Sequence, residues 1–157
     1  MSDLSTRYPE LIFGIGSREN RIKDLHLSYE RALTTYHLKT KGLNFNSYRD
    51  LGIYQLLTDT NHKEIYPSFV TDTLGLLIDY DIENNTNYLS ILSCFFRNDC
   101  HLSRTADSLF FHKNTLKYKM NKIRKILDYD ILTNENRTKI MIALSIYSLG
   151  ESYYKED

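Results

Sequence analysis

The sequence predicts a mainly α-helical protein, in which a C-terminal helix-turn-helix domain follows a small α/β fragment of β-α-β-like order. Three observations support this prediction. Apolar residues recur at three- and four-residue steps through most of the chain, as in helices that bury one face. Short apolar runs that suit strands occur only near the N-terminus. Finally, residues 113–125 are strongly basic, although the whole chain balances 20 basic against 20 acidic residues.

Length and composition limit the class of protein. A chain of 157 residues can form one domain or two small ones, and its 41% apolar and 25% charged content is that of an ordinary soluble protein. No apolar run approaches the ~20 residues that cross a bilayer, and the N-terminus lacks a signal pattern, so we expect a cytoplasmic location. Cys94 and Cys100 are too few for a disulfide scaffold.

The charge distribution suggests four segments. We expect a partial α/β segment at 1–57, an acidic linker with short helices at 58–85, a helix-turn-helix domain at 86–150 and a flexible tail at 151–157. Residues 58–85 carry one basic and six acidic side chains, whereas residues 86–132 carry eight basic and four acidic ones. This segregation indicates that the two regions have different partners.

The N-terminal segment has the pattern of a strand, a helix and a second strand. Residues 11–16, an apolar run closed by glycines, suit a buried strand, and residues 45–48 could form another. Between Ser17 and about Thr40 a helix is expected, and a short helix at 51–57 completes the segment. The residues with helical spacing are Ile22, Leu25, Tyr29, Ala32, Leu33 and Tyr36.

The linker and the flanking helices have recognisable ends. Pro67 favours the first turn of a short helix that Gly75 can end, and a short apolar turn follows. Thr86 or Asn87 can cap the next helix, and Asn134 can cap the last one. We expect Leu89, Leu92, Phe95 and Phe96 on the apolar side of the former, and Ile140, Met141, Leu144 and Tyr147 on that of the latter.

Residues 102–127 have the pattern of a short helix, a turn and a longer helix. Ser103 is the expected cap of a helix at 103–110, the turn follows at Phe111 and His112, and the second helix covers 113–127. We expect Phe110 and Phe111 to pack beneath the turn. On a helical wheel the buried stripe of the second helix is Leu116, Met120, Ile123 and Leu127, and Asn114, Tyr118, Asn121 and Lys125 lie opposite.

This polar face has the side chains that a helix in the major groove of DNA requires. Asn can pair with adenine, Lys can reach guanine acceptors or phosphates, and Tyr can contact a phosphate or a thymine methyl group. The helix start usually reaches bases, so His112, Lys113, Asn114, Lys117 and Tyr118 are candidate base-proximal residues. Asn121, Lys122 and Lys125 are candidate phosphate contacts, and Ser103 and Arg104 could touch a flanking phosphate. The alternative is a lysine-rich helix that merely faces solvent.

Other site chemistries lack the residue patterns that they need. The histidines are scattered, and Cys94, Cys100, His101 and His112 form no C-x-x-C or H-x-x-x-H pair for zinc. Gly14-x-Gly16 lacks the third glycine of a dinucleotide loop and the Gly-Lys-Ser/Thr of a P-loop. We therefore expect no catalytic residue, no cofactor, no metal and no enzymatic activity.

Two runs within the C-terminal region carry a family resemblance. Leu102-Ser103-Arg104-Thr105-Ala106 is followed by Leu109-Phe110-Phe111-His112-Lys113-Asn114-Thr115-Leu116-Lys117-Tyr118-Lys119-Met120. The second run is similar to the "L-F-x-H-R-N-T-L-x-Y-R-L" signature of the PucR/CdaR family of bacterial regulators, with lysine at both arginine places. Lysine keeps the charge but lacks the planar fork for bidentate guanine contacts. Residues 74–149 thus resemble that family's C-terminal helix-turn-helix domain.

The N-terminal segment carries a weaker resemblance to the same family. Residues 13–16, 28–32 and 48–57 are similar to the end of the GGDEF-like domain that precedes the helix-turn-helix in CdaR-type regulators. The Gly-Gly-Asp/Glu-Glu-Phe loop that a cyclase needs is absent. No counterpart of the family's effector-sensing domain is present, so we expect a fragment of a longer regulator, either a natural truncation or a prepared piece.

The resemblance implies a sequence-specific, DNA-binding transcriptional regulator that binds double-stranded DNA, as a homodimer or paired with a related regulator. The acidic residues 58–85 could contact RNA polymerase. An alternative is a protein-interaction module that dimerises with a full-length regulator and modulates it without binding DNA itself. A third alternative is a small enzyme or nucleotide sensor that uses residues 11–57.

Overall fold

The computed structural model describes residue 8, residues 11–43, residue 45, residues 47–58 and residues 64–150. The chain divides into two compact units, residues 1–62 and 63–157, which are treated separately below. The regular structure of the described residues is helical throughout, which confirms a mainly α-helical fold. Within those residues, no helix combines the length and apolar character needed to cross a membrane. The tail expected at 151–157 lies outside them.

The N-terminal unit is built on helix α2 (Leu25–Thr40), which the short 3-10 helix η1 (Ile22–Asp24) precedes. The expected short helix at 51–57 is instead divided into η2 (Tyr48–Leu51) and α3 (Tyr54–Leu57), on either side of Gly52. Leu38, Leu51 and Leu57 are buried in this unit, together with Thr35. The described part of this unit therefore contributes few apolar side chains to a core.

The strands expected at 11–16 and 45–48 do not form among the described residues. Residues 14–16 instead run along α2 at very short range. A Cβ atom on Gly14 would lie 1.9 Å from the Ala32 carbonyl oxygen, and one on Gly16 would lie 1.9 Å from that of Ser28. The two glycines thus permit backbone contact with a helix, where the prediction assumed the end of a strand.

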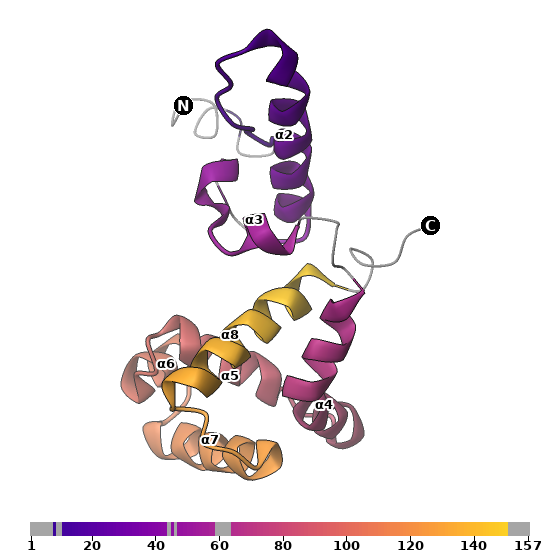
Figure 1. The fold of residues 1–157 in the computed structure, drawn as a ribbon. Coiled ribbons are helices and arrows are strands. Elements are labelled where there is room, and N and C mark those ends of the chain that lie inside the picture. The colour runs from indigo at the N-terminus through magenta and orange to yellow at the C-terminus, as the bar shows by residue number, and fades with distance from the viewer. Residues whose placement is uncertain (1–7, 9–10, 44, 46, 59–63, 151–157) are drawn as a thin grey trace. The chain divides into compact units, whose positions relative to one another are not determined.

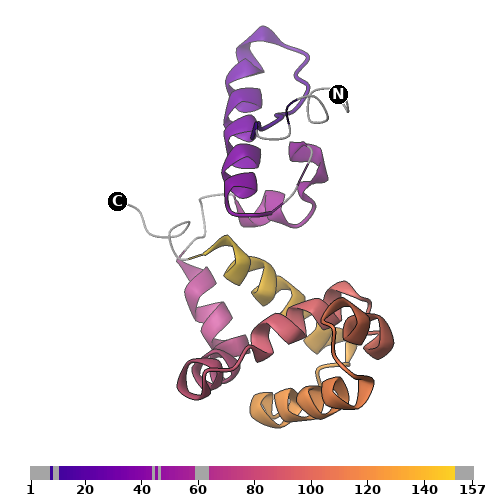
Figure 2. The same cartoon turned by 180° about the vertical axis from the view of Figure 1, so that it is seen from behind.

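The C-terminal unit contains helices α4 (Ile65–Asn84), α5 (Tyr88–Arg97), α6 (Leu102–Ser108), α7 (Lys113–Leu127) and α8 (Asn134–Leu149) (Figures 1 and 2). Helix α4 packs against α5, α7 and α8, and α6 packs against α5 and α7. The shared core includes Leu77 of α4, Leu92 of α5 and Ile140 of α8, each at most 1% exposed. This arrangement fixes the platform on which α6 and α7 lie.

Helix α4 is longer than the sequence predicted. It runs without a break through Gly75, where we expected a short helix to end, and continues to Asn84. Leu74 and Leu77 are fully buried on either side of the glycine, and their packing outweighs its weak helix propensity of about 1 kcal/mol. Residues 65–84 of the expected acidic linker therefore form part of the core of the C-terminal unit.

Helix α5 begins at a cap supplied by α4. The Asp81 carboxylate accepts hydrogen bonds from the Tyr88 and Leu89 amides at 2.8 Å each, and from the Thr86 hydroxyl. Asn87 occupies the N-cap position but makes no side-chain cap bond, so the predicted Thr86 or Asn87 cap is replaced by Asp81. The distant carboxylate satisfies the first amides of the helix and ties α5 to α4.

Helix α8 differs from prediction in its cap and its buried side. The Thr133 hydroxyl, not Asn134, accepts the Asn136 amide at 3.2 Å. The buried residues are Ile140, Ala143, Ile146 and Leu149, while Leu144 is half-buried and Met141 and Tyr147 are about half exposed. Apolar residues occur on several sides of this helix, so periodicity alone does not select the side that packs.

Candidate nucleic-acid interface

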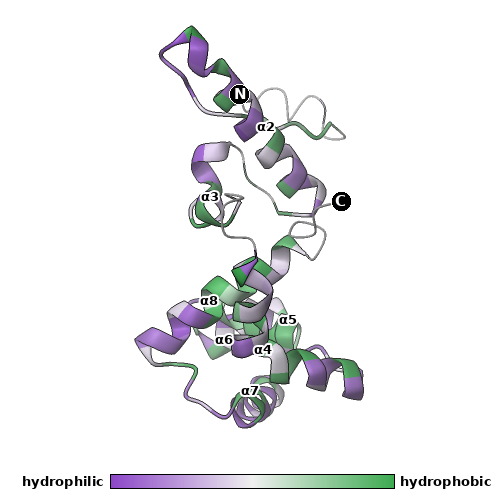
Figure 3. Cartoon of the chain, turned by 45° about the vertical axis from the view of Figure 1, so that its right-hand side comes forward, coloured by the Kyte–Doolittle hydropathy of each residue, from purple (hydrophilic) through white to green (hydrophobic). Residues whose placement is uncertain are grey.

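Helix α7 has the bounds and the buried face that the sequence predicted. It spans Lys113–Leu127, and Leu116, Met120, Ile123 and Leu127 are each at most 3% exposed. The hydropathy colouring in Figure 3 shows both hydrophobic and hydrophilic residues around this helix. Helix α7 packs on α4, α5 and α6, and the side opposite the apolar stripe is exposed.

Helix α6 begins one residue earlier than expected. His101 occupies its N-cap position and Leu102 is its first residue, so Ser103 is not the cap. Leu102 packs against the core, and this packing favours a helix that already includes Leu102. Ala106 is 3% exposed, and its small side chain allows α7 to approach closely.

The turn between α6 and α7 separates its two aromatic residues. Phe111 is half-buried and packs against the core, as expected. Phe110 is 97% exposed, so the prediction that it packs beneath the turn is wrong. Its φ of 54° is left-handed and lets the Phe111 amide donate to the Ala106 carbonyl at 2.9 Å, which ends α6 and turns the Phe110 side chain outward.

His112 closes the start of α7. Its Nδ1 atom accepts a hydrogen bond from the Asn114 amide at 3.3 Å, in the N-cap position. An imidazole that accepts at Nδ1 carries its proton on Nε2 when neutral. His112 can therefore cap the helix and still offer a donor to a phosphate or a base.

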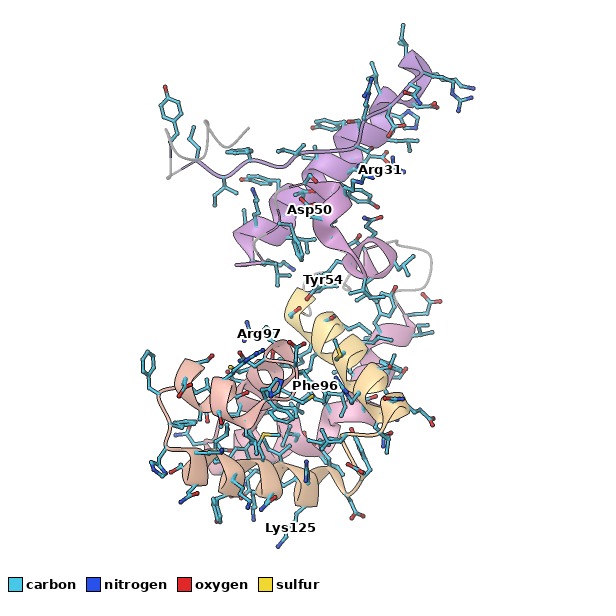
Figure 4. The ribbon with its side chains drawn as sticks, turned by 90° about the vertical axis from the view of Figure 1, so that its left-hand side faces the viewer. Arg31, Asp50, Tyr54, Phe96, Arg97 and Lys125 are labelled. Atoms are coloured by element: carbon cyan, nitrogen blue, oxygen red, sulfur yellow. The ribbon has the colours of Figure 1, made fainter. Side chains whose placement is uncertain are left out.

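The structure brings the candidate DNA-contacting residues onto one continuous run of α6, turn and α7. The exposed residues among them are Ser103, Arg104, His112, Lys113, Asn114, Lys117, Tyr118, Asn121 and Lys125. Figure 4 shows Lys125 pointing away from the other helices of this unit, whereas Phe96 lies among them. Their exposure meets the first requirement for contact with DNA, and the individual contacts stay predictions.

Lys122 is the exception within this group, because it is half-buried beside an aromatic pair. Tyr80 and Tyr88 stack with ring centroids 5.7 Å apart, and the Lys122 Nζ lies 5.4 Å from the Tyr80 centroid. Lys119, which the sequence prediction omitted, has its Nζ 5.2 Å from the Tyr88 centroid and 5.5 Å from that of Phe111. Burial and then the neighbouring Tyr80 raise the pKa of Tyr88. No local pattern links α7 to these tyrosines, so only tertiary structure could reveal this cation–π set.

The electrostatic character of the surface comes from α7 itself. It carries six basic residues and no acidic one, whereas residues 64–96 contain no Lys, Arg or His. Over the described parts of the chain, no group of three or more His, Cys, Asp or Glu side chains is placed to hold a metal ion. The arrangement offers ammonium, amide and hydroxyl groups on one exposed helix face, which suits a polyanion whose base edges carry hydrogen-bond donors and acceptors.

Comparison with known proteins identifies this region. Residues 88–146 match the family model described as the PucR C-terminal helix-turn-helix domain. The proline-responsive transcriptional activator PutR of Bacillus subtilis is 28% identical over 142 residues, covering 87% of this chain and 34% of PutR. The DNA-binding transcriptional activator AdeR of the same organism is 31% identical over 151 residues, covering 91% and 35%. The carbohydrate diacid regulator of Escherichia coli is 29% identical over 65 residues, covering 41% and 17%.

The comparisons cover only part of the relatives and do not identify every segment of the chain. The chain spans about a third of the length of PutR and AdeR. The alignments reach into the N-terminal unit, but they do not support the GGDEF-like assignment of that unit. No solved structure matches the chain significantly. Two of these relatives are named as transcriptional activators and the third as a regulator, which favours DNA binding over the interaction-module alternative.

Proposed function

Because residues 88–146 form a PucR-type helix-turn-helix domain, we propose that this chain is a sequence-specific DNA-binding transcriptional regulator that places α7 in the major groove. The observation that carries the proposal is the division of α7 into a fully buried apolar stripe and an exposed basic and amide-bearing face. A helix that merely faces solvent needs the buried apolar stripe, but it does not need basic and amide side chains gathered on the exposed face.

The dimensions and chemistry of α7 support this placement. Its 15 residues span roughly 22 Å at 1.5 Å per residue, and an α-helix fits the ~12 Å width of the major groove. Lys113, Asn114 and Lys117 lie in its first two turns, where helix-turn-helix proteins contact base edges. Tyr118 is available for a phosphate or a thymine methyl group, and His112 for a backbone phosphate.

Phosphate contacts supply most of the affinity in this proposal. Asn121, Lys122 and Lys125 follow the base-proximal end along α7, and Ser103 and Arg104 lie at the start of α6. Neutralised phosphates release counterions, so binding should weaken steeply with salt. The Tyr80 ring beside Lys122 would hold that ammonium group in place, which reduces the entropy lost on contact.

Two further elements of the proposal concern the direction of regulation and the oligomeric state. PutR and AdeR are named as activators, and we propose activation of transcription for this chain as well. A single recognition helix reads only a few base pairs, so we also propose a homodimer on a two-fold site with half-sites about 34 Å apart. Such a regulator acts in the bacterial cytoplasm, where its DNA lies.

The test begins with the selection of binding sites from a random double-stranded DNA library by the whole chain. Fluorescence anisotropy then measures affinity for the selected site at several salt concentrations. We expect log K to fall linearly with log salt, and Asn114→Ala to weaken binding on the order of tenfold, the ~1–3 kcal/mol of a base contact. Lys117→Ala should weaken binding and, if it meets a phosphate, lower the salt slope by about 1.

Lys23→Ala in the N-terminal unit is the matched control, because it removes the same charge from an exposed site outside α7. It should leave the affinity unchanged. A salt-independent affinity, or full binding by the Asn114→Ala, Lys117→Ala double variant, would contradict the assignment.

A further inference from the structure

The C-terminal unit contains a groove that the DNA-binding proposal does not use. It lies between the second half of α4, the start of α5 and the end of α8, and has a volume of about 630 Å³. No residue of α6 or α7 lines it. Its apolar lining residues are Ile78, Ile82, Leu89, Leu144 and Tyr147.

Two of these apolar residues have large exposed fractions and contribute little to the core of the unit. Ile82 is 76% exposed and Tyr147 is 48% exposed, on opposite walls of the groove. Covering such side chains removes apolar surface from water, which favours binding. The groove therefore offers an apolar binding surface to a partner, and this surface is separate from helix α7, which is proposed to contact DNA.

The charge around the groove specifies what kind of partner fits. Residues 64–96, which include all of α4 and most of α5, contain five acidic residues and no Lys, Arg or His. Asp79 and Glu83 are exposed on α4, three residues before and one residue after Ile82, although neither is part of the groove lining, and no ion pair involves either within the structure's described part. The Asp81 carboxylate in the groove lining is already occupied as the cap of α5.

We propose that this groove binds a protein surface in which an apolar side chain is flanked by lysine or arginine. The apolar side chain would lie between Ile82 and Tyr147, and its basic neighbours would face Asp79 and Glu83. Nucleic acid does not fit, because its phosphates would meet these carboxylates. The inference rests on the proposed function, within which the partner belongs to the transcription machinery and the groove is the activating surface.

A second copy of the chain is a poorer occupant than a separate protein. A second copy would have to present a basic surface, and the most basic element of the C-terminal unit is α7. In the proposed function the exposed face of α7 binds DNA. The two surfaces of one regulator would then act at once, with α7 on the operator and the acidic groove on the machinery beside it.

The experiment separates DNA binding from activation. The selected DNA site is placed upstream of a weak promoter, and transcription is measured with purified RNA polymerase holoenzyme and the whole chain. Ile82→Ser removes the exposed apolar side chain, and the Asp79→Lys, Glu83→Lys double variant reverses the charge. We expect DNA affinity within about twofold of the wild type, while activation falls on the order of tenfold, as for a residue central to an interface.

Ile65→Ser is the matched control. Ile65 lies on the same helix and is 55% exposed, but it does not line the groove and is more than three turns away from Asp79, so its replacement should leave activation unchanged. Full activation by both groove variants overturns the proposal, as does a wild type that occupies its site without activating. If the Ile82→Ser variant loses both its dimeric molecular mass in solution and its DNA affinity, the groove binds a second copy of the chain. This result would also overturn the proposal. Absence of DNA binding by the wild type would instead contradict the proposed function.

Discussion

Helices α2 and α7 have almost the same length but use their surfaces differently. Helix α7 buries one apolar stripe completely and presents amines and amides on the other side. Helix α2 buries Thr35 and Leu38, and leaves Leu25, Tyr29, Leu33 and Tyr36 more than a third exposed. The apolar residues with helical spacing in α7 are buried in the core, whereas most of the apolar residues with helical spacing in α2 are exposed.

The difference shows that helical periodicity identifies a helix but not what covers it. The C-terminal unit supplies α7 with three packing partners, α4, α5 and α6. Among the described residues of the N-terminal unit, α2 is packed by the short helical turns η1 and η2 and by the close passage of residues 14–16. Stability should therefore respond very differently to equivalent changes in the two units.

The largest contrast is expected for leucine truncation. Leu116→Ala in α7 should lower the free energy of unfolding of the C-terminal unit by about 3 kcal/mol, because Leu116 is fully buried and its loss leaves a cavity. Leu33→Ala in α2, at a position 37% exposed, should cost less than about 1 kcal/mol in its own unit. Denaturant unfolding followed by circular dichroism measures both, and equal costs would remove the contrast.

Alanine at two glycines should act with opposite signs. Gly14→Ala forces a Cβ atom to within 1.9 Å of the Ala32 carbonyl oxygen, so it should destabilise the N-terminal unit by about 2 kcal/mol. Gly75→Ala adds a Cβ atom 3.4 Å from the Thr71 Cγ2 atom, an ordinary contact inside α4, and should stabilise the C-terminal unit by about 0.5–1 kcal/mol. Hydrogen exchange resolved by segment distinguishes the two effects. Destabilisation by Gly75→Ala would show that α4 is broken there.

The turn before α7 allows a sharper test within one unit. Phe110→Gly should stabilise by roughly 1 kcal/mol, because the residue has a left-handed φ and its side chain is almost entirely exposed. Phe111→Gly, its neighbour, should destabilise because Phe111 packs against the core. Thermal unfolding measures both, and a loss of stability in Phe110→Gly would mean that its ring supports the fold.

A similarly small effect is expected at Tyr129, whose hydroxyl donates to the Thr73 carbonyl at 2.9 Å. Tyr129→Phe should cost about 1 kcal/mol at neutral pH. Burial raises the pKa of Tyr129 above its ordinary value of 10.0, so the neutral hydroxyl stabilises the folded state below pH 10. That contribution is lost as the pH rises through the folded pKa.

Urea unfolding of the two proteins between pH 8 and 11 would therefore show a shallower alkaline loss of stability for Tyr129→Phe than for the wild type. Tyr147→Phe, at a half-exposed position, is the control for loss of a hydroxyl. Parallel pH profiles for wild type and Tyr129→Phe would contradict the role given to this bond.

Much of the candidate interface could be predicted because its signals are local. The bounds of α7 and its buried stripe both depend on residues within a few turns of one another. The exposure of Phe110 could not be predicted, because it depends on which residue adopts the left-handed conformation that ends α6. The side of α8 that packs could not be predicted either, since Met141 and Ala143 are both apolar and the positions of α4 and α5 select between them.

The sequence by itself determined the amphipathic pattern of α7, its basic charge and the turn before it, because period and charge are properties of the local chain. Tertiary structure alone decided that α4 continues through Gly75, that Asp81 caps α5, and that Gly14 lies against α2. It also decided that Lys119 and Lys122 lie over aromatic rings and that a groove opens between α4, α5 and α8. Each of these depends on groups from separate elements meeting in space, which no local pattern encodes.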